Sequence, residues 1–160
     1  YYQLANAASY PKPVQARPRI WIGGNGERRT LRIAARHADG WNTPYPSPDE
    51  FKRLSGVLDM WCEKEGRDPA TIERNVNLSF HMAASPAHLP AAEAQFRQVW
   101  GASSDVMRKR GVVAGLADEA IDLVGKLGDA GAARVNIAIR PPVDWDALHA
   151  WTEQVIPAFS

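Results

Sequence analysis

The sequence has little cysteine, no long hydrophobic run and no excess of charge of either sign. Cys62 is the only cysteine in 160 residues, so no internal disulfide can form and no oxidising compartment is required. No apolar run approaches the roughly 20 residues of a membrane helix. Nineteen Lys and Arg balance 18 Asp and Glu, which excludes a strongly basic nucleic-acid binder. We therefore expect no nucleic-acid or membrane partner, and a cytoplasmic location.

Several motifs that would assign a reaction are also missing. The run Gly23-Gly24-Asn25-Gly26 lacks the third glycine of Gly-x-Gly-x-x-Gly, and no Gly-Lys-Ser/Thr follows it, so neither a Rossmann turn nor a P-loop is predicted. The sequence contains no Gly-x-Ser-x-Gly elbow. His37, His88 and His149 have no ligand-like spacing, so we expect no metal site.

What the sequence does contain is an alternation of short β-favouring segments and amphipathic helical segments. Strands are predicted at residues 20–22, 41–43, 75–84 and 134–140. Helices are predicted at residues 27–38, 48–66, 91–100 and 118–131, and from Asp144 onward. Residues 1–19 are a proline-punctuated connector, and residues 101–111 are expected to be mobile. This order predicts an α/β fold with a parallel sheet and right-handed crossovers.

The second helix has the clearest signals. Ser47 can cap it, Pro48 suits its first position, and Glu50 would complete a capping box. Its apolar residues recur at spacings of three and four and form a stripe that should face the core: Phe51, Leu54, Leu58, Trp61 and Cys62.

The glycine run lies between the first strand and the first helix. Backbone N–H groups of Gly23, Gly24, Asn25 and Gly26 could converge on an anion, and the following helix would add its positive end. Arg28 could add charge, so the turn suits a phosphate. The alternative is a tight turn that needs positive φ and binds no ligand.

Three more residues at strand ends are candidates for a site. His81 lies on the third predicted strand, where its neighbours Phe80 and Met82 face the other way. It could donate a proton or contact a cofactor, or it could be a core histidine. Arg140 could hold an anionic substrate or cofactor tail, or it could simply cap the surface. Trp41 could line a pocket for a ring.

Three stretches together resemble the bacterial-luciferase-like superfamily of flavin- and deazaflavin-dependent oxidoreductases. They are residues 11–15 (Pro-Lys-Pro-Val-Gln), residues 20–27 (Ile-Trp-Ile-Gly-Gly-Asn-Gly-Glu) and residues 31–42, which end in Asp-Gly-Trp-Asn. Residues 115–131 look like the start of the last βα unit of that family. Two departures are Arg19, where a proline is usual, and Leu116-Ala117, where Ser-Pro or Thr-Pro is common.

The resemblance implies a fold and a cofactor. The family is a (β/α)8 barrel of roughly twice this length, so residues 1–160 would form a single partial barrel domain, the C-terminal half with four βα units. The turn at Gly23, Gly24, Asn25 and Gly26 would then contact the phosphate end of coenzyme F420 or of FMN. The Asp-Gly-Trp motif that contains Trp41 is largely structural in the family.

The resemblance also implies an activity. It favours F420-dependent hydride transfer to or from a small organic substrate, with an FMN-dependent monooxygenase that uses reduced flavin and O2 as the alternative. Catalytic residues stay unknown, because the substrate-side residues of the family lie mostly in the N-terminal half. Two further alternatives are a non-catalytic half-barrel that binds a phosphate ligand and half of a sugar-phosphate enzyme.

A half-barrel has physical consequences for the isolated chain. It should expose two open sheet edges and an apolar inner face. We therefore expect weak stability, self-association into a homo-oligomer in which two copies could approximate a closed barrel, or a chain that is a fragment of a complete parent protein.

Overall fold

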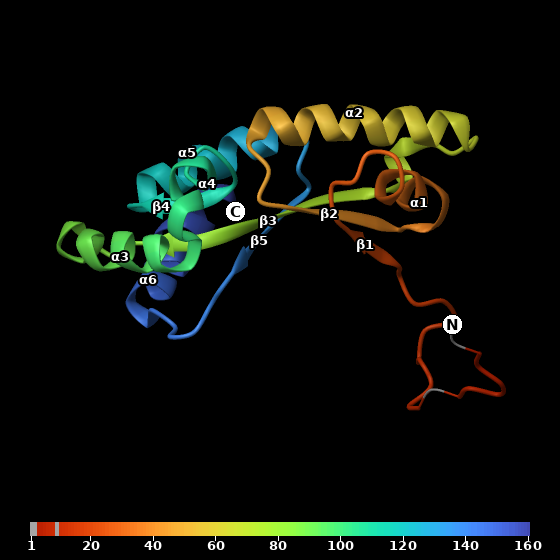
Figure 1. The fold of residues 1–160 in the computed structure, drawn as a ribbon, viewed down its shortest axis with the longest axis horizontal. Coiled ribbons are helices and arrows are strands. Elements are labelled where there is room, and N and C mark those ends of the chain that lie inside the picture. The colour runs from red at the N-terminus through yellow and green to blue at the C-terminus, as the bar shows by residue number, and fades with distance from the viewer. Residues whose placement is uncertain (1–2, 9) are drawn as a thin grey trace.

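A parallel sheet forms the centre of the computed structural model, which describes residues 3–8 and 10–160 (Figure 1). The strands are β1 (Trp21–Gly23), β2 (Gly40–Pro44), β3 (Glu73–Met82), β4 (Val112–Gly115) and β5 (Arg134–Ala138). The helices are α1 (Thr30–His37), α2 (Pro48–Lys64), α3 (Leu89–Trp100), α4 (Ser104–Met107), α5 (Ala117–Asp129) and α6 (Trp145–Ala150), and helical turns continue through Trp151–Val155 and Ile156–Phe159. The parallel α/β architecture predicted from the sequence is confirmed.

The ten-residue strand β3 pairs with three other strands. Its first half pairs with β2, with Asn75 opposite Asn42, and its second half pairs with β4, with His81 opposite Ala114. Its other edge pairs with β5. Successive residues of a strand direct their backbone groups to opposite edges, so β2 and β4 share one edge of β3. Strands β1, β2, β3 and β5 therefore lie side by side in this order, and β4 is an additional strand that pairs with β3 beyond the end of β2.

The sequence did not predict α4, which lies within the segment expected to be mobile, or β4, which follows that segment directly. Four residues are too few to give a clear period, and the strand depends on distant contacts. Gly111 donates its N–H to the Tyr45 carbonyl oxygen at 3.2 Å, and a Cβ on Gly111 would lie 2.6 Å from the Pro46 carbonyl oxygen. Strand β4 forms because Gly111 fits against the end of β2.

The start of the first helix also differs from the prediction. Helix α1 begins at Thr30 rather than at residue 27. The Glu27 carbonyl oxygen accepts a hydrogen bond from the Trp61 indole at 2.8 Å, and the Glu27 carboxylate binds Arg53 at 2.9 Å. Contacts with α2 therefore hold residues 27–29 as a turn.

Of the cap predicted for α2, the N-cap forms and the capping box does not. Ser47 Oγ accepts a hydrogen bond from the Glu50 N–H at 3.1 Å, which confirms the N-cap. The Glu50 carboxylate does not close a capping box, because it binds the Arg110 guanidinium at 3.0 Å. A long-range ion pair replaces the local contact, and it joins α2 to the segment that leads into β4.

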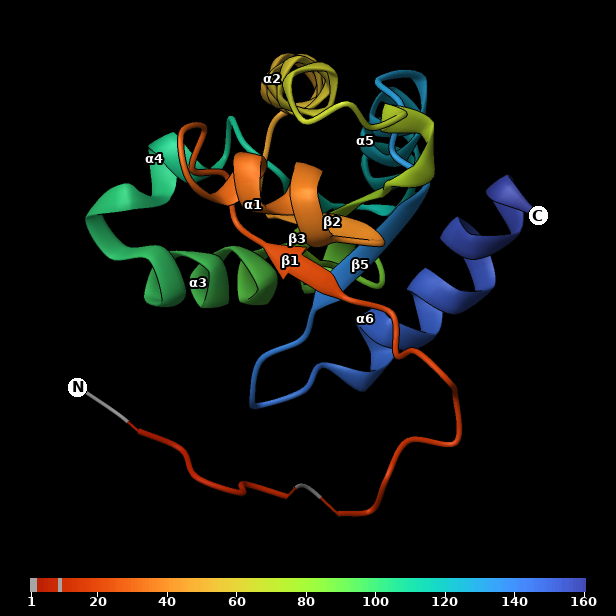
Figure 2. The ribbon, with the colours of Figure 1, turned by 90° about the vertical axis from the view of Figure 1, so that its right-hand side faces the viewer.

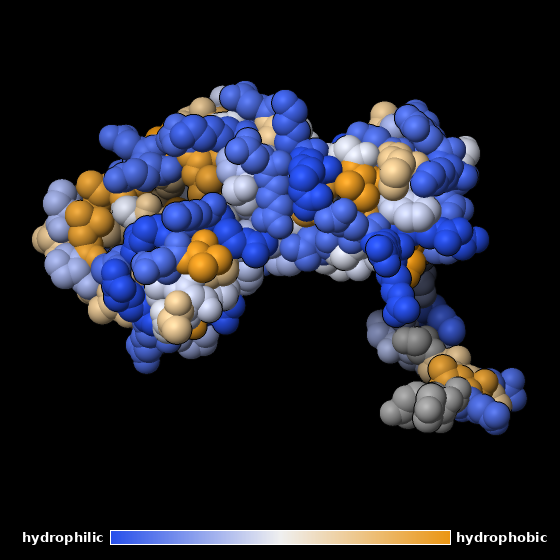
Figure 3. Space-filling model, turned by 45° about the horizontal axis from the view of Figure 1, so that its top comes forward, coloured by the Kyte–Doolittle hydropathy of each residue, from blue (hydrophilic) through white to orange (hydrophobic). Residues whose placement is uncertain are grey.

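Helices α1, α2, α5 and α6 pack on one face of the sheet, and this face holds the larger apolar core. Helices α3 and α4 pack on the His81 side of the sheet, where Phe96, Met107 and Val112 form a second, smaller cluster. In both views α2 and α5 lie on the same side of the strands (Figures 1 and 2). Alternate residues of β3 face them: Val76, Leu78, Phe80 and Met82. The outer surface of this helical layer is mostly hydrophilic, with separate hydrophobic patches (Figure 3). The predicted stripe of α2 lies in this core, with Trp61 packed at its margin.

The opposite face of the sheet is polar along the first half of β3, which corrects the expectation of an apolar inner face there, whereas apolar side chains of α3 cover it at the His81 end. Because side chains alternate, this face carries Asn42, Asn75, Asn77, Ser79 and Asn136. The strand register places Asn42 beside Asn75 and Asn77 beside Asn136.

The first prediction concerns the α2 stripe. Leu58 is fully buried, whereas Met60, two residues later on the same helix, is 38% exposed. We expect Leu58→Ala to lower the free energy of unfolding by about 2 to 5 kcal/mol through lost burial and a cavity. Met60→Ala should change it by less than about 0.5 kcal/mol. Chemical denaturation of both variants measures this, and equal effects would contradict the assignment of the core face.

A second prediction follows from the sheet edges. Within residues 3–8 and 10–160, β1 pairs only with β2, and β5 pairs only with β3. Unpaired edges favour association through new strand pairing, so self-association stays our prediction. Sedimentation velocity over a dilution series should show a species of twice the 17.6 kDa chain mass. A compact monomer that unfolds cooperatively at all concentrations would contradict it.

Candidate functional site

The glycine turn after β1 is built without room for side chains. Gly24 has φ +118°, and its N–H donates to the Asn42 carbonyl oxygen at 2.9 Å. A Cβ on Gly24 would lie 3.3 Å from Thr30 Cγ2, and one on Gly26 would lie 2.9 Å from Thr30 Oγ1. The turn thus packs closely against the start of α1. Because the Gly24 N–H is used within the sheet, other N–H groups of the turn would have to contact an anion.

The Asp-Gly-Trp motif holds this turn from behind. The Trp41 indole donates to the Gly24 carbonyl oxygen at 2.7 Å, and the buried ring stacks on Phe51 with 5.7 Å between centroids. Gly40 lies against the Trp21 ring, where a Cβ would be 2.2 Å from a ring carbon. Trp41 is fully buried, so it supports the turn instead of lining a ring pocket, and we leave it out of the ligand-contacting set.

Asp39, the first residue of that motif, fixes the start of β1. Its carboxylate accepts hydrogen bonds from the Ile20 N–H at 2.7 Å and from Arg17 at 2.8 Å. The Arg17 hydrogen bond, followed by that of Ile20, lowers the pKa of Asp39. These bonds link the N-terminal connector to the loop between α1 and β2. They therefore determine where the chain enters the sheet.

The surroundings of the turn fit an anionic ligand. Ten of the fourteen arginines have a carboxylate partner within 4.0 Å in the described part of the chain. Arg28 and Arg29, which follow the turn and are exposed, are not among these ten. The side-chain oxygen of Asn42, level with Gly23, is buried and has no hydrogen-bond partner among the residues that the structure describes. Free positive charge, a turn without side chains and an unpaired polar atom therefore lie together.

His81 does not join this group. Its ring is 3% exposed, its Nε2 is 2.9 Å from Ser79 Oγ, and it packs edge-to-face on Phe96. Burial is the largest influence on the histidine and lowers its pKa. Of the two readings of His81, the structure favours the core histidine.

The strand register separates His81 and Arg140 from the glycine turn. Gly23 is level with Asn42 and Asn75, and His81 lies six residues further along β3. At ~3.3 Å per residue this is about 20 Å. The same offset holds for Arg140, six residues beyond Arg134, which is level with Asn75. Figure 1 shows β1 and α1 at one end of β3, and α3 and β4 at the other.

Arg140 instead meets two aromatic residues that the sequence did not single out. Its Nη2 donates to the Tyr45 hydroxyl at 3.3 Å, and its guanidinium lies 5.7 Å from the Trp100 ring centroid. Tyr45 follows β2 and Trp100 ends α3. Residues on three elements that are far apart in sequence meet here, and no local pattern in the sequence indicates this.

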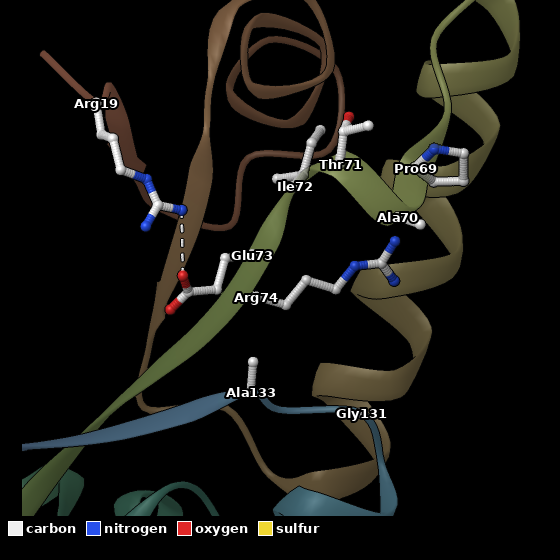
Figure 4. Close-up of a pocket in the computed structure, with 9 residues that line it drawn as sticks. All are labelled: Arg19, Pro69, Ala70, Thr71, Ile72, Glu73, Arg74, Gly131 and Ala133. Atoms are coloured by element: carbon white, nitrogen blue, oxygen red, sulfur yellow. Dashed lines mark hydrogen bonds and ion pairs between the residues drawn. The ribbon is translucent and has the colours of Figure 1, made fainter.

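A surface pocket of about 480 Å³ lies at the N-terminal ends of β3 and β5 (Figure 4). Its charges neutralise one another: Glu73 binds both Arg19 and Arg134, and Arg74 binds Asp59. Ligands of parallel α/β folds bind at the C-terminal ends of the strands. We therefore assign this ion-pair network to stability and do not place the functional site in it.

Two kinds of feature are absent from the described ranges. No helix there is long and apolar enough to cross a membrane. No three side chains of His, Cys, Asp or Glu gather there as metal ligands would. The cytoplasmic location stays a prediction.

Comparisons with known proteins agree on a family and a fold. The family model of luciferase-like monooxygenases matches residues 1–140. An F420-dependent secondary alcohol dehydrogenase, solved with an F420–acetone adduct, is 18% identical with a TM-score of 0.77, over 100% of this chain and 54% of that one. A coenzyme F420-dependent tetrahydromethanopterin reductase from Methanopyrus kandleri is also 18% identical, with a TM-score of 0.63 over 88% and 50% of the two chains.

A monooxygenase is also among the similar solved structures. EDTA monooxygenase from Chelativorans sp. BNC1 is 16% identical with a TM-score of 0.67, over 92% of this chain and 45% of that one. The chain thus spans about half the length of these solved structures. No curated protein sequence matches it. The sheet is consistent with the partial barrel of luciferase-like enzymes.

The environment of His81 predicts a dependence of stability on pH. Its pKa is lowered in the folded chain from the ordinary 6.5, so below pH 6.5 the unfolded chain binds more protons and stability falls as the pH falls. We expect Tm to drop between about pH 7.5 and 5.5, and to drop less in His81→Gln. An identical drop in the two proteins, measured by calorimetry, would contradict a buried neutral His81.

Proposed function

Because the chain belongs to the luciferase-like monooxygenase family, we propose that it is the cofactor-phosphate-binding half of an oxidoreductase that transfers a hydride between coenzyme F420 and a small organic substrate. The glycine turn is the observation that carries this. It combines a left-handed Gly24, the exposed Arg28 and the buried oxygen of Asn42, which has no hydrogen-bond partner within residues 3–8 and 10–160. Two of the named structural neighbours are F420-dependent enzymes, which favours this cofactor.

The residues of the turn would bind and orient the cofactor. Backbone N–H groups of Gly23, Asn25 and Gly26, with the Arg28 guanidinium, would bind phosphate oxygens. The Asn42 side-chain oxygen would accept a hydrogen bond from a hydroxyl of the same ligand. When bound, the deazaflavin supplies the hydride chemistry.

An FMN-dependent monooxygenase is the second candidate function. The family description and the similarity to EDTA monooxygenase favour it. FMN also ends in a phosphate, so the same turn would serve both cofactors. The turn therefore does not discriminate between the two candidates, and the ring-binding part of the protein decides.

A titration of the 160-residue chain tests the proposal. We expect tighter binding of F420 than of FMN, followed by fluorescence. Gly24→Val should raise the dissociation constant at least about tenfold, because a branched side chain is strained at positive φ and crowds Thr30. Gly56→Val is the matched control, since a Cβ at Gly56 on α2 meets no atom within 4 Å. Thermal unfolding checks that both variants fold.

Each outcome has a meaning. Preference for FMN would favour the monooxygenase candidate. Equal affinity of Gly24→Val and the unchanged chain would remove the turn from the site. Binding of neither cofactor would contradict the assignment of the phosphate site to this chain. Cofactor binding without any turnover of added alcohols or aldehydes would favour a non-catalytic phosphate-binding half-barrel.

A further inference from the structure

We propose that Arg140, Tyr45 and Trp100 form a subsite for the carboxylate of an organic acid, separate from the glycine turn. That this acid is the substrate rests on the proposed function. That the subsite takes a carboxylate rests only on the geometry and charge of the three residues.

The first argument is charge. Arg140 is exposed and, unlike ten other arginines, has no carboxylate within 4.0 Å among residues 3–8 and 10–160. The nearby Asp144 forms no ion pair with Arg140 within 4.0 Å, and its carboxylate caps α6 by accepting the Ala147 N–H at 2.9 Å. The positive charge of Arg140 is therefore available to an anion.

The second argument is orientation. Nη2 is the guanidinium nitrogen that donates to a described side chain, the Tyr45 hydroxyl at 3.3 Å, and one face of the group lies over Trp100. The Tyr45 and Trp100 rings meet edge-to-face at 5.5 Å. A guanidinium fixed at one nitrogen and one face presents its remaining N–H groups in a plane, which matches a carboxylate. The Tyr45 hydroxyl accepts from Arg140, so its own proton can be donated to the same ligand.

The third argument is the backbone of Tyr45. It has φ +50°, a left-handed conformation that bulky residues rarely adopt. Three hydrogen bonds hold it there: its N–H donates to Asn77 at 2.8 Å, and its carbonyl oxygen accepts from Arg110 at 3.0 Å and from Gly111 at 3.2 Å. Conformations fixed in this way cluster at ligand sites. Here the conformation directs the phenol to Arg140.

Position separates this subsite from the cofactor phosphate. By strand rise, Arg140 is about 20 Å from the level of Gly23. One phosphate cannot contact both. Because both lie toward the C-terminal ends of the strands, where barrel ligands bind, a second ligand at Arg140 would face the same mouth as the cofactor.

The test uses benzoate as the probe and benzamide as its neutral analogue, with the 160-residue chain labelled with ¹⁵N. The Trp100 indole resonance is identified by its loss in Trp100→Phe. We expect benzoate to shift this resonance saturably and benzamide to leave it unchanged. Arg140→Met should weaken benzoate binding at least about tenfold, Arg140→Lys by less, and Tyr45→Phe severalfold.

The matched control is Arg97→Met. Arg97 is an exposed arginine of α3, the helix that ends at Trp100, and it binds Glu93 at 2.7 Å. This variant should bind benzoate as the unchanged chain does. Unchanged benzoate affinity in Arg140→Met, or equal binding of benzamide, would overturn the proposal. Inorganic phosphate that competes as well as benzoate would also overturn it, because the subsite would then not select a planar group.

The outcome is separable from that of the proposed function. Benzoate binding that depends on Arg140 but persists in Gly24→Val supports the subsite, whether or not F420 or FMN binds. Loss of F420 binding in Arg140→Met, with no effect of benzoate, would assign Arg140 to an acidic part of the cofactor and overturn a substrate subsite.

Discussion

The alternation of side chains along β3 is the constraint on which the rest of the structure depends. This strand pairs on both edges, and its successive side chains point to two opposite faces that meet different surroundings. Val76, Leu78, Phe80 and Met82 face the helices and form the core, and the residues between them are polar. A shift of one residue in register would reverse both faces. The positions of β2, β4 and β5, and of the loops that end them, follow from this register.

The same strand separates the two candidate sites, the glycine turn and the region of Arg140. Strand β1 is short and pairs with β2, so the glycine turn lies level with the first half of β3. Strand β3 continues beyond the end of β2 and takes β4 as a new partner. This extension carries the chain to the level of His81 and Arg140. Candidate residues that a simple barrel would bring close together are thereby spread along the sheet.

The agreement between sequence and structure was best where the signals were local. Ser47 caps α2 as its position before Pro48 predicts, and the apolar spacing from Phe51 to Cys62 identifies the buried face. It failed where a distant partner replaced a local one. Glu50 binds Arg110 instead of closing its own cap, and Trp41 binds Gly24 and Phe51 behind the turn instead of lining a pocket. No local pattern in the sequence indicates these distant partners.

By itself, the sequence determined the parallel α/β order, the glycine turn and the family. Each depends on short runs of residues whose backbone preferences and hydrophobic period act locally. Only the tertiary structure decided that β4 joins the sheet, that the inner face is polar along the first half of β3, and that Tyr45, Trp100 and Arg140 meet. Those features depend on which residues lie opposite one another across strands far apart in the chain. Register and packing fix this, and neither is encoded within any single segment.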